Sequence, residues 1–380
     1  MKKLISLVIC VTFALTIYAQ NLQRPEHETL AWKILQDSQL AYEQGDLGEA
    51  IRIADAAKQQ RKREVEWSLS VLNQALVPPA IQKLGDDISL IMNAFEERNS
   101  EDALLVIHNA MIKYPIETIN NSIAELMKKI ALHKEYPEAD YLLGKLYTFE
   151  GEYSIADRYL TNAWMNAAIL DVPEQKFDIL YQMAALAKLQ KNEEKYEKSL
   201  LLIIADDKYI KPDGSDDIFI RAVKQSIARD DTTIDKLFTL YRSKAYTSLN
   251  AYYLLTDYYI SKGNTDKALS MSTLATLIAF TRIYEALVAR DMDYKFMKPE
   301  NAKNVPNSAF LNYLETVGEY YDISEWGAKN GIWKGYFNYA KILHAAGRYE
   351  LAEELFSCLS QYCPEDFWRK MALRELLKLF

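Results

Sequence analysis

Glycine, proline, cysteine and histidine are all scarce in this sequence. Its 380 residues include 12 Gly, 10 Pro, 3 Cys and 4 His. Runs that alternate apolar and polar residues are also rare, which argues against a protein built on β-strands. Most of the chain instead has apolar residues at positions i, i+3, i+4 and i+7. This period predicts an all-α chain in which glycine is kept for turns, because it is unfavourable inside helices.

Signatures of catalysis and of cofactor binding are missing as well. There is no glycine-rich phosphate loop, no H-E-x-x-H motif and no G-x-S-x-G motif. The few histidines lie far apart, at His27, His108, His133 and His344. The acidic stretch 213–217 offers oxygen ligands of the kind calcium takes, but it lacks the spacing of an EF-hand loop. We interpret it as a solvated turn in which Ser215 caps a helix. We therefore expect a protein that is not an enzyme and that holds no cofactor or metal.

The charge balance is acidic, with a formal net charge of −8. Such a chain is not expected to bind nucleic acid or to dock on a membrane through a basic patch. Apolar residues make up 49% of the sequence, enough to bury a large core. No segment after the N-terminal region is long and apolar enough to predict a transmembrane helix in the mature chain.

The first 19 residues have the layout of a secretory signal peptide. Lys2 and Lys3 are followed by a largely apolar run of about fifteen residues, and Ala19 suits a cleavage site. We expect a periplasmic or secreted protein. A lipid anchor on Cys10 is an alternative, but Ile9 stands where a small residue would be needed, so the anchor is less favoured.

The stretch YLLGKLYTFEGEYSIADRYLTNAW, residues 141–164, predicts a helical hairpin. Gly144 falls inside the first helix, where a missing side chain lets a second helix approach closely at Ala156. Gly151 falls between the helices, where a positive φ is needed. Tyr147 and Leu160 are the large residues that fill the space beside these small ones.

These residues resemble the tetratricopeptide repeat family, whose pattern places small residues, an aromatic residue and a turn glycine at the same offsets. Clear copies recur at residues 252–275 and 336–364, a further copy lies at 41–57, and weaker ones lie at 98–115 and 183–200. The first three turn positions are 53 residues apart instead of the family's 34, so we expect inserted helices at 65–76 and 116–134.

The resemblance implies an irregular α–α superhelix of antiparallel hairpins, closed by a capping helix over residues 365–380. We expect N-terminal repeats over residues 20–204 and C-terminal repeats over residues 205–380, as one continuous solenoid.

The resemblance also implies that a protein or peptide partner binds the concave face formed by the first helix of each hairpin. Carried over to this sequence, the family's groove positions are Tyr141, Lys145, Phe149, Asn250, Tyr253, Asp257, Lys334, Phe337, Asn338, Lys341 and His344. The positions on the last copy would hold a carboxylate or phosphate next to an apolar group, or else form a solvated basic stripe beside a core aromatic residue.

Two further points stay open at the level of sequence. The first is whether Cys358 and Cys363 form a disulfide or remain two separate thiols. The second is the class of function. The favoured interpretation is a periplasmic interaction scaffold, and the alternative is a small-ligand-binding accessory subunit of a periplasmic transport system.

Overall fold

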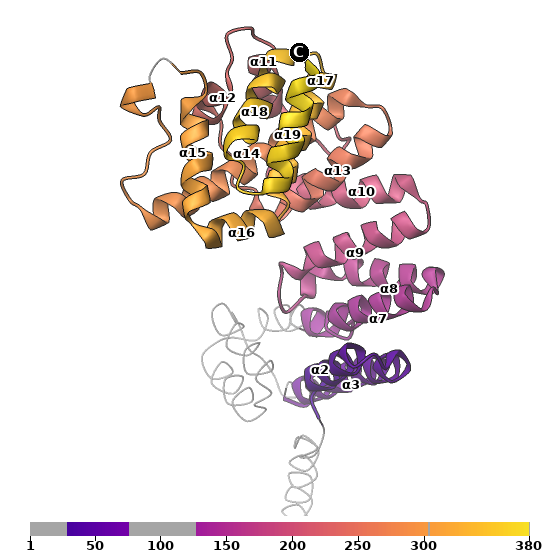
Figure 1. The fold of residues 1–380 in the computed structure, drawn as a ribbon. Helices are drawn as coiled ribbons and strands as arrows, with labels where there is room; N and C mark the ends of the chain where they lie inside the picture. Colours follow the sequence, from indigo (N-terminus) through magenta and orange to yellow (C-terminus); the bar gives the residue numbers. More distant parts are fainter. Residues whose placement is uncertain (1–28, 76–126, 303–304, 380) are drawn as a thin grey trace, which may run out of the picture. The chain divides into compact units, whose positions relative to one another are not determined.

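The computed structural model describes residues 29–75, 127–302 and 305–379 (Figure 1). Every regular element in these ranges is an α-helix or a short 3-10 helix, and the one β-type pairing recorded there is an isolated bridge between Ile210 and Asp216. The prediction of an all-α fold of helical hairpins is confirmed. The predicted signal peptide, the copy at 98–115 and most of the helix expected at 116–134 lie outside the described residues.

The chain divides into two compact units, Met1–Leu186 and Ala187–Phe380. The division falls within α9 (Gln175–Leu189), which is earlier than the 204/205 boundary expected from the sequence.

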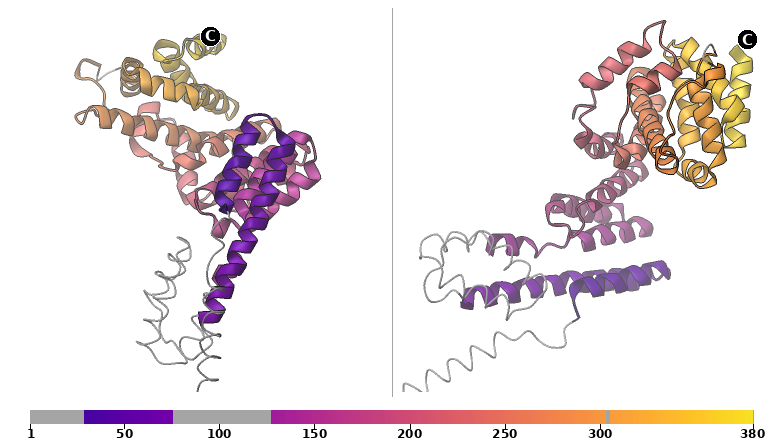
Figure 2. Two further views of the ribbon diagram at one scale, coloured as in Figure 1. Left: turned by 90° about the horizontal axis from the view of Figure 1, so that it is seen from below. Right: turned by 90° about the vertical axis from the view of Figure 1, so that its left-hand side faces the viewer.

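The described residues of unit 1 form two helical hairpins. The first pairs α2 (Ala31–Glu43) with α3 (Leu47–Ala75), and the second pairs α7 (Pro137–Glu150) with α8 (Tyr153–Met165). The long α3 runs antiparallel to α2 and extends well beyond the N-terminal start of α2 (Figure 2). It also packs against α7. The inserted helix expected at 65–76 is therefore the last part of α3, because no glycine or proline follows Gly48 in the helix.

Unit 2 contains two further hairpins and a group of shorter helices. The hairpins are α13 (Leu249–Ser261) with α14 (Thr265–Arg290), and α17 (Ile332–Ala345) with α18 (Tyr349–Tyr362). The remaining α-helices that begin in this unit are α10 (Glu193–Ile204), α11 (Ile218–Ile227), α12 (Ile234–Leu240), α15 (Ser308–Glu319), α16 (Tyr321–Lys329) and α19 (Asp366–Leu379). The last of these, α19, packs on α17 and α18 as the predicted capping helix.

The core of unit 2 is built around α14. This helix is long and apolar enough to cross a membrane by length and composition, but most of its apolar stretch is buried inside the unit. Residues 268–281 of α14 are all buried, and α13, α16 and α17 pack against the helix. A helix that is apolar all round is expected at such a central position in a helical protein.

Glycine in the left-handed conformation closes each of the four hairpins, as predicted. The residues are Gly45, Gly151, Gly263 and Gly347, with φ between +69° and +83°. At Gly151 the backbone N–H bonds back to the carbonyl of Thr148, and the next N–H bonds to that of Tyr147. The turn thus satisfies carbonyl groups that the end of α7 would leave open. In the weak copy at 183–200 a lysine, Lys191, takes this conformation instead.

Gly144 is where the helices of the second hairpin come closest. A Cβ atom added there would lie 2.6 Å from the side chain of Leu160 in α8. The predicted neighbour, Ala156, is fully buried, but Leu160 is the residue that lies over the glycine. The predicted close approach of the two helices at Gly144 is therefore present, and the large Leu160 side chain fills the space that the glycine leaves.

Two carboxylates, one buried and one partly buried, tie distant segments of unit 2 together. Asp235 in α12 accepts hydrogen bonds from the backbone N–H groups of Ala309 and Phe310, at 3.1 and 2.8 Å, at the start of α15. Glu354 in α18 accepts one from the N–H of Ile234, at 3.1 Å, at the start of α12. Because the first N–H groups of a helix have no partner within the helix, these carboxylates complete the helix ends.

A buried ion pair joins the two hairpins of unit 1. The Asp140 side chain is fully buried in α7, and its Oδ1 lies 2.5 Å from the Lys58 ammonium of α3. Burial raises the pKa of Asp140, and the hydrogen bond from Lys58 opposes that rise. The second oxygen, Oδ2, is buried without a hydrogen-bond partner. The Lys58 ammonium also lies 5.0 Å from the ring centroid of Tyr159 in α8, so the pair links three helices.

We predict that Gly144→Ala destabilises unit 1 by about 1–3 kcal/mol, because overpacking at Leu160 outweighs the gain in helix propensity. The matched control is Gly318→Ala in α15, where an added Cβ meets no atom within 4 Å. There the propensity gain alone should stabilise the protein by up to about 1 kcal/mol. Urea unfolding of both variants measures the difference, and equal effects would contradict the packing argument.

We predict that Asp140→Leu lowers the free energy of unfolding by about 3 kcal/mol, because it leaves the Lys58 ammonium without its partner in a largely buried position. The double variant Lys58→Met/Asp140→Leu should recover most of that loss, since it removes both charges and the unpaired oxygen. A double-mutant cycle in urea tests this. Additive losses in the cycle would show that the pair is not coupled.

Candidate functional site

In unit 1 an aromatic surface lies on the first helices of the two hairpins. We define the aromatic face by Tyr42 on α2 and by Tyr141, Lys145 and Phe149 on α7. The rings of Tyr42 and Phe149 are 5.5 Å apart. The Lys145 ammonium lies 5.3 Å from the Tyr42 ring centroid and 5.5 Å from that of Tyr141. Three positions predicted from the sequence are therefore brought together, and they are joined by Tyr42, which the sequence analysis did not select.

The aromatic face is accessible and carries one cation. Phe149 is 63% exposed, while Tyr141 and Lys145 are partly buried. Within the described part of the chain no carboxylate pairs with Lys145, so its ammonium remains open to an anionic group. Burial raises the pKa of Tyr141 to about 12, and the charge of Asp178 contributes to the rise. The Tyr141 hydroxyl is thus protonated at neutral pH and can donate a hydrogen bond.

In unit 2 the predicted positions lie on α13 and α17. Asn250 and Asp257 are exposed on α13. The Tyr253 ring lies directly over Gly335 of α17, where an added Cβ would fall 2.5 Å from the tyrosine hydroxyl oxygen. Tyr253 therefore fills the seam between the two first helices, and its hydroxyl is buried without a hydrogen-bond partner.

The predicted basic stripe on α17 is only partly surface. Lys334 and Lys341 are exposed, and Asn338 is half-buried. The His344 ring is also half-buried and packs 4.9 Å from the Tyr349 ring. Phe337 was expected beside the stripe on the binding face, but it is only 4% exposed.

Phe337 is buried because the capping helix covers it. Its ring lies 5.3 Å from the Trp368 ring of α19 and 5.7 Å from the Phe356 ring of α18. This ring belongs to the core, so the alternative stated above, a solvated basic stripe beside a core aromatic residue, describes Phe337 correctly.

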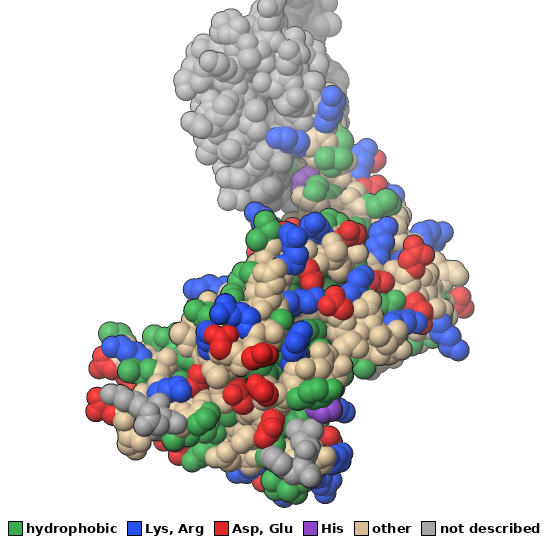
Figure 3. Space-filling view, turned by 90° about the horizontal axis from the view of Figure 1, so that it is seen from above, with side chains coloured by type: hydrophobic (Ala, Val, Ile, Leu, Met, Phe, Trp, Pro, Cys, Tyr) green, Lys and Arg blue, Asp and Glu red, His purple; other side chains and the backbone are tan. Residues whose placement is uncertain are grey.

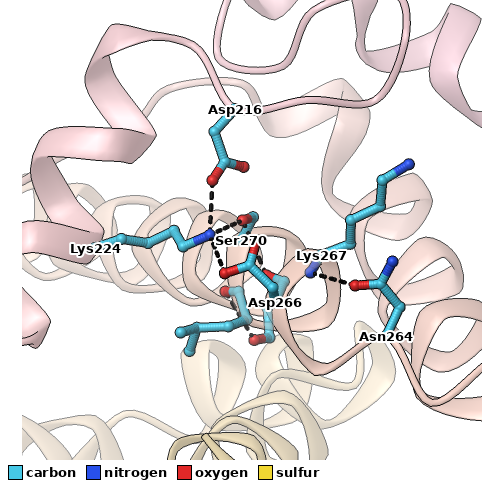
Figure 4. A network of polar contacts seen from close by, with 8 residues as sticks. Asp216, Lys224, Asn264, Asp266, Lys267 and Ser270 are labelled. Carbon is cyan, nitrogen blue, oxygen red and sulfur yellow. Dashed lines mark hydrogen bonds and ion pairs between the residues drawn. The ribbon is translucent and has the colours of Figure 1, made fainter.

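The acidic loop before α11 is already occupied by its own neighbours. Asp213 accepts hydrogen bonds from the backbone and hydroxyl of Ser215. Asp216 pairs with the Lys224 ammonium at 2.7 Å, and the same ammonium lies 2.6 Å from Asp266 (Figure 4). We predicted Ser215 as the helix cap, and this is wrong: the cap of α11 is Asp217, whose side chain accepts a hydrogen bond from the Ile218 N–H. In the described segments no group of three or more His, Cys, Asp or Glu side chains is placed to hold a metal ion.

The two described cysteines are both free and buried. Cys358 packs inside α18, and Cys363 ends that helix. Burial raises the pKa of Cys363 to about 12, so the thiolate that would form a disulfide is scarce. The structure thus has them as two separate thiols, one of the two alternatives left open by the sequence.

Charged side chains of both signs are interspersed over the face shown in Figure 3. Exposed ion pairs on the surface of unit 2 include Arg229 with Asp231 and Lys370 with Asp366. A surface of this kind favours solubility over a long-range field of one sign.

Comparison with known proteins gives a relative but no family. No family model matches the sequence. A protein of Treponema pallidum (strain Nichols), described as an uncharacterized protein, is 29% identical over 349 residues, covering 92% of this chain and 90% of that one. A solved "circular tandem repeat protein with novel repeat topology and enhanced subunit contact surfaces" is 14% identical, with a TM-score of 0.23, over 91% of this chain and 78% of that one. The score is too low to carry an argument, so the repeat-like fold rests on the helical hairpins themselves.

We predict that Tyr253→Phe leaves the fold intact and stabilises unit 2 by about 1 kcal/mol, because it removes a buried hydroxyl that has no partner. Thermal and urea unfolding measure the change. The conservative control is Tyr252→Phe, which should be destabilising because the Tyr252 hydroxyl donates a 2.9 Å hydrogen bond to Asp207. A loss of stability in Tyr253→Phe would indicate a hydrogen bond that the hydroxyl makes in solution.

Proposed function

We propose that this protein is a non-catalytic interaction scaffold that binds a peptide or protein partner on the first helices of its hairpins, in the manner of tetratricopeptide repeats. The observation that carries the proposal is the aromatic face of unit 1. The Lys145 ammonium lies over the rings of Tyr42 and Tyr141, and Phe149 packs on Tyr42, so the group joins two neighbouring first helices.

The chemistry of the aromatic face suits a peptide. Aromatic side chains offer a large apolar area at low entropic cost, and they are enriched at protein interfaces. A lysine that is held over two rings is pre-positioned, so it can bind a carboxylate without first being ordered. The partner we propose therefore presents an apolar side chain next to an acidic group.

We further propose that the protein acts after export, in the periplasm or outside the cell. The support is the signal-peptide pattern of residues 1–19, with its two lysines, apolar run and small residue at the cleavage position.

The alternative function, a small-ligand-binding accessory subunit, is favoured by a different observation. In unit 2 a half-buried arginine, Arg242, lies against the rings of Phe280 and Tyr284. A cation beside an apolar surface suits a small organic anion.

We predict that a photo-crosslinking amino acid at position 149 captures a defined protein partner in the native cell. The matched control is the same substitution at Met165, which is 67% exposed on α8, the second helix of the same hairpin. Lys145→Glu should remove most of the product formed at position 149, because it places a negative charge where we propose that a carboxylate binds. Equal capture at both positions, or a product that Lys145→Glu leaves unchanged, would contradict this use of the aromatic face.

A further inference from the structure

The C-terminal helix α19 has one packed face and one exposed face. It packs on α17 and α18 through residues that include the fully buried Ala372 and the ring of Trp368 (Figure 1). Three large apolar side chains, Phe367, Leu373 and Leu377, lie on the other side and are between 46% and 67% exposed. The last helix of a helical repeat protein is expected to present a polar face to water. These exposed side chains therefore indicate that a further surface packs on α19.

The exposed face of α19 is also basic. With about 3.6 residues per turn, the same side of the helix carries the charged residues Asp366, Lys370, Arg374 and Lys378. The two lysines are paired with carboxylates of their own helix. Arg374 lies one turn from Leu377, and its guanidinium has no recorded hydrogen bond or ion pair among the described residues. This face thus offers apolar area together with one unpaired cation.

The first described helix, α2, has an exposed face of the opposite charge. It packs on α3 and α7, while Trp32 and Leu40 on its other side are nearly half exposed. The exposed charged residues of this helix are Lys33, Asp37 and Glu43. Asp37 lies one turn from Leu40, and no partner of its carboxylate is recorded in the described ranges. Tyr42, which belongs to the aromatic face, lies on another side of α2 and is half-buried.

The two exposed faces complement each other. Each combines an aromatic ring and leucine with an unpaired charge one turn from an exposed leucine, and the two unpaired charges have opposite sign. Packing the faces together would remove apolar area from water, which is favourable. A contact between two α19 helices would bury the same leucines, but it would bring two basic faces together. Because like charges across an interface are unfavourable, the charges favour α19 against α2.

We propose that the protein self-associates head to tail, with the exposed face of α19 of one copy packed on that of α2 of the next. Arg374 pairs with Asp37 across this contact. Each face is one helix of 13 or 14 residues, so the contact is small and we expect a Kd of about 10–100 µM. Every assembly keeps one free face of each kind, so growth continues or closes into a ring. The proposal does not rest on the partner-binding role of the aromatic face.

The first test blocks one face at a time in the chain of residues 20–380. Leu373→Gln/Leu377→Gln removes the apolar contact on α19, and Trp32→Gln/Leu40→Gln removes it on α2. Each double variant should weaken self-association at least about a hundredfold, because two large apolar side chains are lost. The control is Leu189→Gln, at an exposed leucine of α9, which should associate as the wild type does. All of these side chains are exposed or nearly half exposed, so circular dichroism and Tm should match the wild type.

Sedimentation velocity then separates the possible contacts. The wild type should form assemblies larger than a dimer as its concentration rises to about 500 µM, and each blocked variant alone should stay monomeric. An equal mixture of the two variants should form a dimer and nothing larger, since one intact face of each kind remains. A monomeric wild type, a mixture that stays monomeric, or a variant blocked at α2 that still dimerises alone would overturn the proposal.

The second test reverses the central charge pair. Arg374→Glu or Asp37→Arg places like charges at the contact, and each should weaken association by about tenfold. The double variant Asp37→Arg/Arg374→Glu carries the reversed pair at every contact and should associate about as the wild type does. Stronger association of Arg374→Glu, as a contact between two α19 helices would give, or a double variant no stronger than the single ones, would overturn the pairing of α19 with α2.

Discussion

Close helix approach at glycine is the constraint on which both units depend. Gly144 lies under Leu160, Gly335 under Tyr253 and Gly327 under Trp333, and in each case an added Cβ would fall 2.5–2.6 Å from the covering side chain. A glycine inside a helix costs about 1 kcal/mol in propensity. That cost is offset because a large apolar side chain is buried where a methyl group would have kept the two helices apart. Gly144, Gly327 and Gly335 therefore mark where helices must meet.

The close helix contacts at these glycines determine which aromatic side chains are used in packing and which stay exposed to a partner. Tyr253 has a groove position by sequence, yet its ring covers Gly335 and its hydroxyl is buried, so it serves packing. Phe337 is likewise covered by the capping helix. On unit 1, Phe149 lies near the end of α7 and beyond the glycine seam, and it stays 63% exposed. A face of first helices thus presents to partners only the residues that packing has not used.

The sequence predicts features that depend on residues close together in the chain, and it does not predict contacts between distant residues. The turn at Gly151 and the seam at Gly144 depend on residues within one hairpin, and their spacing was sufficient to predict them. The continuity of α3 was missed because a repeat period, and not the absence of helix breakers, was used to place boundaries. Tyr42 packs against Phe149, which is more than a hundred residues later in the sequence. Arg242 lies near Phe296, and the whole of α14 separates the two in the chain. No spacing along one sequence encodes such contacts.

The two cation–aromatic groups differ in their access to water, and this difference separates their proposed roles. Lys145 lies over two rings at an accessible face, where water can still solvate the ammonium. It therefore needs no fixed counter-ion and can accept different acidic side chains from a flexible partner. Arg242 is half-buried against aromatic rings, and burial has removed part of its hydration. An anion that binds there must replace lost water with matched hydrogen bonds, which favours a small group of defined charge and shape.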